Sequence, residues 1–448
     1  MSENTLLSTV LQNSAYGYIK PRPNRRWLAY VAGAAVVTLT VLAFLLFRNE
    51  RTFAGLEMHG GPVVIASYEY PEIVALTSHW EQQWLASDDN ASSAVSWSYL
   101  HFDVWAFNAS DLSRKWMTRV STIKSGRRNL DEGILGVDNG TIWLIADGLI
   151  AIDANDGHVI ADATKIEAKN AVLHGLMPNA RRQILFDNGL VLIAADGKRW
   201  RIDPQTLAAA SEPDVSKNIL LGSGSGFYRP LRMSSTYHSF KMRSYVVGDT
   251  WYGMMHPSEL AMFEKRDPYT QAFGKALRYK LWAAPIHDTL SRFRDPIREA
   301  HNWKPQPNSE EYLEGGLLAV PDSAGHDGVV GIAKPTRFLV IHQNRVEERA
   351  EQLLSCVGLD GRICWTAPLT LTMLNAFALI AKGGPASWAV IAVGETNREH
   401  KDKYLDPDRS SFPAFVRVGV SDGKVLRMSF ESIDLAELSR TLKPYRKR

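Results

Sequence analysis

The sequence predicts an all-β domain preceded by one membrane-spanning helix, and three observations carry this prediction. A stretch of 21 residues without a charge, from Trp27 to Phe47, lies near the N-terminus. Beyond it, short runs rich in β-branched and aromatic residues are bounded by Gly, Asp or Asn. One unit of strand, turn and strand also recurs along the chain. Regularly spaced short strands are typical of β-barrels, sandwiches and propellers.

The uncharged stretch has the length of a membrane-spanning helix, because about 20 residues at about 1.5 Å each cross a hydrocarbon core of about 30 Å. Only Thr38 and Thr40 are notably polar within it, and a helical Thr bonds its hydroxyl to the carbonyl one turn earlier. A cleaved signal peptide is the rival interpretation. Its apolar region is shorter, however, and small residues stand at its cleavage site, where this chain has Arg48 to Arg51. We therefore expect an uncleaved signal-anchor.

Basic residues beside the anchor predict its orientation. Lys20, Arg22, Arg25 and Arg26 precede the helix, whereas Arg48 and Arg51, offset by Glu50, follow it. Because basic residues stay on the cytoplasmic side, residues 1–26 should form a cytoplasmic tail. Residues 52–442 then form one extracytoplasmic domain, periplasmic in a Gram-negative bacterium, and 443–448 form a short basic tail. We expect a single-pass protein of the inner (plasma) membrane, with the lipid bilayer as one partner.

The charge of the chain argues against a nucleic-acid partner. The formal net charge is +3. Ten basic and two acidic residues lie outside the predicted domain, so that residues 52–442 carry 41 basic and 46 acidic residues and are mildly acidic. A nucleic-acid surface normally shows a basic stripe, and the sequence of this domain contains no such stripe.

The recurring unit narrows the choice of architecture. Its clearest copy is GLIAIDANDGHVI at 148–160, and the other copies are VWAFNASDLSRKW at 104–116, WRIDPQTL at 200–207, LSCVGLDGRICW at 354–365 and FVRVGVSDGKVL at 415–426. These copies resemble the repeats of the quinoprotein-type (PQQ-like) β-propellers, and Trp116 and Trp365 keep the aromatic residue of that pattern. The resemblance implies a β-propeller of about six to eight blades, in which Asp and Gly shape the turn and Trp covers the joint between blades.

One segment interrupts the strand pattern and is predicted to be a helical insertion, residues 254–312. Residues 257–263 and 288–300 within it have helical patterns. Trp251, Trp282, Arg294 and Trp303 form a candidate partner surface, because Trp and Arg are enriched at interfaces. The alternative is that these aromatic residues form the core of their own segment. A second domain beginning near Tyr237 also remains open.

The two cysteines, Cys356 and Cys364, flank the turn Leu359-Asp360-Gly361 symmetrically. If the hairpin is centred on Asp360, they face each other across neighbouring strands and form a candidate disulfide in an oxidising compartment. The alternative is two small hydrophobic residues of a strand, because ordinary cross-strand spacing strains a disulfide.

Other motifs give weak signals for chemistry. The run Gly222 to Gly226 imitates a phosphate loop but lacks the Lys-Ser/Thr that follows one. His326-Asp327 has no G-x-S-x-G nucleophile to serve, and no His pair has metal-ligand spacing. We therefore predict neither a cofactor nor a metal site.

The sequence favours binding over catalysis. We expect a membrane-anchored binding or scaffold protein of the cell envelope, non-enzymatic, with an envelope protein as partner. The alternatives are a quinoprotein-like enzyme and a sensor of small ligands. The family resemblance implies that a quinoprotein dehydrogenase would have adjacent cysteines and a calcium-binding carboxylate cluster, and this chain has no Cys-Cys pair.

Overall fold

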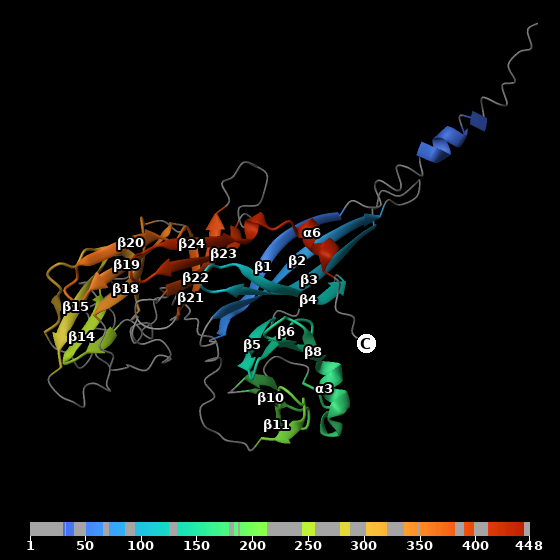
Figure 1. Ribbon diagram of the computed structural model, residues 1–448, viewed down its shortest axis with the longest axis horizontal. Helices are drawn as coiled ribbons and strands as arrows, with labels where there is room; N and C mark the ends of the chain where they lie inside the picture. Colours follow the sequence, from blue (N-terminus) through green and yellow to red (C-terminus); the bar gives the residue numbers. More distant parts are fainter. Residues whose placement is uncertain are drawn as a thin grey trace, which may run out of the picture. The chain divides into compact units, whose positions relative to one another are not determined.

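The described residues are mostly strand, which confirms the prediction of an all-β fold (Figure 1). The computed structural model describes residues 30–31, 33–39, 51–65, 71–85, 95–124, 132–178, 183–186, 189–212, 244–255, 278–286, 302–319, 336–346, 350–380, 389–397 and 411–442. By internal contacts the chain divides into two units, residues 1–52 with 82–98 and residues 53–81 with 99–448. The second unit includes the buried polar residues His79, Asp103 and Arg119.

Within the described ranges, four antiparallel sheets have four strands each, and a fifth has eight. The four-stranded sheets are β1 Arg51–Ile65, β2 Glu72–Leu85, β3 Val95–Asn108 and β4 Arg114–Lys124; β5 Gly133–Asp138, β6 Thr141–Ile145, β7 Leu149–Asp153 and β8 Val159–Asp162; β9 Ile184–Phe186, β10 Leu190–Ile193, β11 Arg199–Ile202 and β12 Ala209–Ser211; and β21 Met373–Ile380, β22 Ala389–Asn397, β23 Ser411–Gly419 and β24 Val425–Ser429. The eight-stranded sheet contains β13 Ser244–Val247, β14 Thr250–Met255, β15 Arg278–Pro285, β16 Lys304–Pro305, β17 Tyr312–Ala319, β18 Arg337–Gln343, β19 Gln352–Gly358 and β20 Ile363–Pro368.

Each of the five copies of the repeat forms a tight turn that joins the last two strands of its sheet, and the turn is one residue shorter at Gly358–Gly361 than in the other four copies. In every copy a residue with positive φ donates its N–H to the carbonyl that begins the turn. These hydrogen bonds are Leu112 to Asn108, 2.8 Å; Gly157 to Asp153, 3.0 Å; Leu207 to Asp203, 2.8 Å; Gly361 to Gly358, 2.9 Å; and Gly423 to Gly419, 2.8 Å. The sequence repeat is therefore a structural repeat, although Leu occupies the expected glycine position twice.

Tryptophan side chains cover two joints between consecutive sheets, as the repeat predicts. Trp116 on β4 donates its indole N–H to the carbonyl of Ala154, 3.1 Å away in the next sheet. Its ring lies so close to Gly157 that a Cβ there would be 2.4 Å from it. Trp365 on β20 repeats this arrangement, with a 3.1 Å hydrogen bond to Val420 and its ring against Gly423.

Hydrophobic clusters show which sheets pack together. Sheet β1–β4 packs against β5–β8, which packs against β9–β12. Strands β18–β20 pack against β21–β24, and that last sheet packs in turn against the first one. Phe107 and Phe415 mark this last contact, with ring centroids 5.3 Å apart.

The eight-stranded sheet divides into two halves, β13–β16 and β17–β20. Only two residue pairs join β15 to β17, Arg278 with Leu313 and Tyr279 with Tyr312. Side chains of the two halves pack together, because Met254 and Leu281 share a cluster with Phe338.

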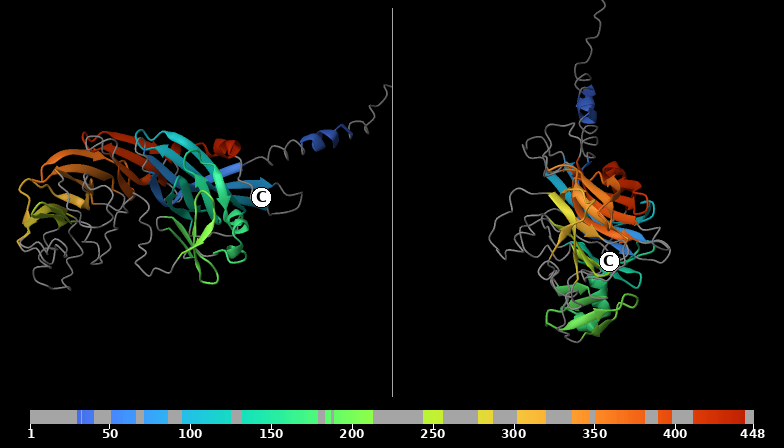
Figure 2. Two further views of the ribbon diagram at one scale, coloured as in Figure 1. Left: turned by 60° about the horizontal axis from the view of Figure 1, so that its bottom comes forward. Right: turned by 90° about the vertical axis from the view of Figure 1, so that its left-hand side faces the viewer.

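The described residues of the second unit include four short helical segments, α3 Ala163–Lys169, η1 Ala171–Leu173, η8 Phe430–Ser432 and α6 Leu435–Thr441. Asp434 caps α6, because its carboxylate accepts the N–H groups of Ala436 and Glu437. Leu438 is buried against the cluster between the last and first sheets, and α6 lies beside the blue and cyan strands in Figures 1 and 2.

The predicted membrane span extends beyond the described residues on both sides. Residues 30–31 and 33–39 are helical, and the Thr38 hydroxyl bonds to the carbonyl of Ala34 at 2.8 Å, as expected of a helical Thr. Among the described residues, no helix has both the length and the apolar character needed to cross a membrane.

The structure differs from the predicted insertion at 254–312. Its described residues include β15 and β16, and β15 pairs with β14 through six residue pairs such as Met254 with Leu281. β15 is therefore a strand with apolar side chains on the covered side of its sheet, and this part of the segment is not helical. The helices predicted at 257–263 and 288–300 lie outside the described residues.

Candidate functional site

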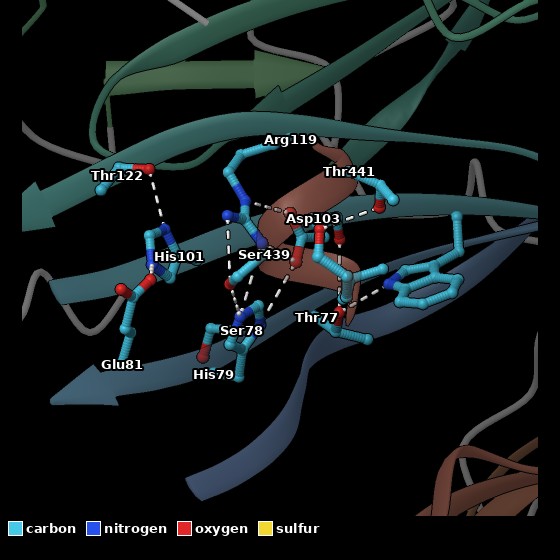
Figure 3. A network of polar contacts seen from close by, with 12 residues as sticks. Thr77, Ser78, His79, Glu81, His101, Asp103, Arg119, Thr122, Ser439 and Thr441 are labelled. Atoms are coloured by element: carbon cyan, nitrogen blue, oxygen red, sulfur yellow. Dashed lines mark hydrogen bonds and ion pairs between the residues drawn. The ribbon is translucent and has the colours of Figure 1, made fainter. Parts of the chain in front are cut away.

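The first sheet carries a group of buried polar side chains on the face that it turns towards α6 (Figure 3). Alternate residues of a strand share a face, so Ile73 and Ala75 of β2 lie on the same face as His79. Ile73 and Ala75 belong to the apolar cluster that the first sheet shares with β21–β24. Farther along β2, the residues on the same face are polar. We call Thr77, His79, Glu81, His101, Asp103, Arg119, Thr122 and Ser439 the polar network.

Asp103 and Arg119 form the centre of the network. The guanidinium donates Nε–H to Oδ1 over 2.8 Å and Nη2–H to Oδ2 over 3.3 Å. His79 Nδ1 lies 3.2 Å from Oδ2. Burial by itself would raise the pKa of Asp103, but its contacts with His79 and Arg119 outweigh burial and hold the pKa below its usual value. Asp103 is therefore an ionised carboxylate.

Ser439 extends the network to the C-terminal helix α6. Its Oγ lies 3.5 Å from Nε2 of His79 and 3.5 Å from Nη1 of Arg119. Asp103, His79 and Ser439 thus form a chain of carboxylate, imidazole and hydroxyl, which is the order of groups in a serine-hydrolase triad. Arg119 changes what they can do, because its Nη2 lies 3.4 Å from the nitrogen that would have to take the serine proton. The nitrogen that would act as the base therefore has a guanidinium as its neighbour.

His101 forms a second pair beside the first. Its Nε2 lies 2.9 Å from Oε2 of Glu81, its Nδ1 lies 2.9 Å from the Thr122 hydroxyl, and its ring centroid is 5.1 Å from that of His79. Burial, reinforced by the charge of Arg119, lowers the pKa of His101 to about 4 although Glu81 opposes the shift. The neutral ring then donates from Nε2 to Glu81 and accepts at Nδ1 from Thr122.

Sequence reasoning did not identify this network, although part of its signal is visible. Thr77, His79 and Glu81 alternate along one strand, and His101 and Asp103 alternate along the next. Polar residues at a period of two within otherwise apolar strands indicate one shared, buried face. Ser439 has no such signal, since its approach depends on the packing of the last helix against the first sheet.

Three residues of the predicted partner surface lie inside the fold. Trp251, Trp282 and Trp303 are 1%, 9% and 6% exposed and share a cluster with Val246 and Ala284. Trp282 also donates its indole N–H to the backbone of its own sheet. Their burial supports the alternative that these aromatic residues form the core of their segment. Arg294 lies outside the described residues, and the partner surface stays a prediction.

The two cysteines are free thiols, Cys356 buried and Cys364 exposed. Residue 356 does not pair with residue 364 as a symmetric hairpin requires. Cys356 stands opposite Trp365 and Val357 opposite Ile363, because the ladder contains a β-bulge.

Two of the weaker sequence motifs, residues 222–226 and 326–327, lie outside the described residues. Within the part of the chain that the structure describes, no group of three or more His, Cys, Asp or Glu side chains is placed to hold a metal ion.

Comparison with known proteins gives a likeness of fold alone. No protein-family model and no curated protein matches the sequence. The chain is similar to a quinonprotein alcohol dehydrogenase-like protein from Bacteroides thetaiotaomicron, with 9% identity, 82% of this chain and 96% of that chain covered, and a TM-score of 0.18. It is also similar to a DUF4221 family member from Bacteroides vulgatus, with 9% identity, coverage of 86% and 88%, and a TM-score of 0.17. At these TM-scores the likeness carries no argument about function.

Proposed function

We propose that this chain is a single-pass inner-membrane protein whose periplasmic domain is a six-bladed β-propeller with a non-enzymatic binding or scaffold role. The uncharged stretch 27–47 and its basic flank support the anchor and its orientation. The propeller is supported by the repeated turn, the tryptophan-covered joints and the packing of the last sheet on the first. Among the described strands, counting the two halves of the eight-stranded sheet separately gives six units, which supports six blades.

The observation that carries the non-enzymatic role is the position of Arg119. It holds Asp103 in a buried ion pair and approaches both His79 and Ser439. In the side chains that most resemble a catalytic triad, a guanidinium therefore lies beside the histidine, and the contacts of Ser439 with the first sheet are long, 3.5 Å each. We infer that the sheets act as a scaffold for their connecting loops. Binding residues concentrate on the loops of such scaffolds.

Crosslinking in intact membranes tests this proposal. The full chain carries an N-terminal tag, and the matched control joins residues 1–51 to an unrelated soluble domain, so that the anchor is kept and the propeller is removed. We expect the full chain to retain at least one envelope protein that the control does not. Recovery of the same proteins with both chains, together with a small molecule bound to the full chain, would contradict the scaffold role and favour a ligand sensor or an enzyme.

A further inference from the structure

The hairpin between β19 and β20 brings a buried and an exposed thiol together. Cys356 is 0% exposed and belongs to the cluster between β18–β20 and β21–β24, whereas Cys364 is exposed. The register runs from Cys356 opposite Trp365 to Val357 opposite Ile363. Residue 364 is therefore the extra residue of the bulge, and it shares the place opposite Cys356 with Trp365.

The bulge places Cys364 next to the residue that stands opposite Cys356, so the two cysteines are near neighbours across the ladder. Opposite Cα atoms of an antiparallel pair are about 4.5–5.5 Å apart, and a disulfide joins Cα atoms about 4.4–6.8 Å apart. In a regular ladder the Cβ atoms of opposite residues stay farther apart than the roughly 3.8 Å that a disulfide requires. A bulge re-aims the side chain of the extra residue, so the spacing of a regular ladder does not apply to Cys364.

The surroundings of the two thiols give them different chemistry. Burial raises the pKa of Cys356 to about 11, and contact with the Cys364 thiol adds to the rise while Arg337 opposes it. Cys356 is accordingly a protonated and protected thiol. Cys364 is the thiol that a dissolved oxidant reaches first.

We propose that Cys364 and Cys356 are a redox pair that a hydroperoxide converts into a disulfide. The Cys364 sulfur gives two electrons to the peroxide, whose O–O bond breaks, leaving one oxygen on sulfur as a sulfenic acid and the other in water or an alcohol. The Cys356 sulfur then attacks the Cys364 sulfur, and its proton leaves with the hydroxyl group as water. The product holds one new S–S bond.

The bond would act on a joint between two sheets. Trp365 follows Cys364 directly, bonds to the carbonyl of Val420 and covers Gly423 in the next sheet. A covalent link across the bulge fixes the backbone from which this tryptophan extends. Oxidation at the surface is thereby connected to the packing of β20 against the turn between β23 and β24.

Alkylation of the full chain in detergent tests the pair, and only these two cysteines are present. After reduction and removal of the reductant, a maleimide should modify Cys364 in the folded chain and Cys356 only after denaturation. After hydrogen peroxide, neither cysteine should be alkylated in denaturant until a reductant is added. The intact mass should have fallen by two hydrogens, with no crosslinked dimer.

Two variants separate the steps. In Cys356→Ser the oxidised Cys364 should be trapped by dimedone, and in Cys364→Ser the Cys356 thiol should survive the same treatment. The pair is refuted if wild-type Cys364 stops at the dimedone-reactive stage, forms only intermolecular disulfides, or resists peroxide altogether. These outcomes do not depend on whether the chain binds an envelope protein.

Discussion

Arg119 donates its Nε–H to Oδ1 of Asp103 over 2.8 Å, and the two side chains are 2% and 0% exposed. Arg119→Met should therefore leave a buried carboxylate without its cation. We expect the free energy of unfolding to fall by about 3–5 kcal/mol, the usual cost of breaking a buried pair from one side. Urea unfolding followed by circular dichroism measures the change.

A surface pair provides the matched control. Lys198 lies 3.1 Å from Asp196, with side chains 71% and 30% exposed. Lys198→Met should cost less than about 1 kcal/mol, because exposed ion pairs contribute little. The double variant Asp103→Leu with Arg119→Met should recover much of the stability lost in Arg119→Met. Equal losses in Arg119→Met and Lys198→Met would show that the ion pair does not brace the first sheet.

Gly157 and Gly140 test the tryptophan joint with a matched pair of substitutions. Both have positive φ, 76° and 79°, so Ala at either position strains the backbone by about 1–2 kcal/mol. Nothing lies within 4 Å of a Cβ at Gly140, whereas a Cβ at Gly157 would be 2.4 Å from the Trp116 ring. Gly157→Ala should lower the urea midpoint clearly more than Gly140→Ala, since the indole must leave its place. The same loss in both variants would mean that Trp116 contributes nothing to the joint.

These turns are also where sequence reasoning performs best. Asp153 accepts the N–H of Asn155 at 2.8 Å, as expected of a turn Asp, and Gly157 takes the positive φ that the sequence predicts. Both features depend on residues within the same few positions of the chain. Local chemistry of this kind can be inferred from one sequence.

The polar network and the cysteine pair could not be predicted from local sequence patterns, because they depend on long-range packing and on a β-bulge. Ser439 meets Arg119 across 320 positions of sequence, because the last helix packs on the first sheet. The bulge that offsets Cys364 shifts a register by one residue, and symmetric spacing about Asp360 predicts the unbulged ladder instead. The aromatic and arginine composition of 251–303 similarly indicates an interface, although Trp251 and Trp282 pack inside a sheet.

His101 should make the stability of the domain depend on pH. Its pKa is about 4 in the folded chain against about 6.5 when unfolded, so between these values the unfolded chain binds more protons. The contribution of the neutral ring is complete above pH 6.5 and is lost as the pH falls towards 4, up to about 3 kcal/mol. Urea unfolding at several pH values should show this slope reduced in His101→Gln. His158→Gln changes an exposed histidine outside the network and serves as control; an equal slope in wild type and His101→Gln would contradict the prediction.

Ser439 should remain unreactive towards a fluorophosphonate probe, which labels activated serines. Attack by Ser439 would transfer its proton to Nε2 of His79, 3.4 Å from the guanidinium of Arg119, and two cations would then stand side by side. We expect no label on the full chain, as in Ser439→Ala, while a known serine hydrolase in the same mixture is labelled. Ser439→Ala should cost less than about 1 kcal/mol of stability, because the contacts it removes are long. Label on Ser439 in the wild type that disappears in Ser439→Ala would identify an activated nucleophile, and the non-enzymatic role would have to be abandoned in favour of a hydrolase whose Arg119 holds the developing oxyanion.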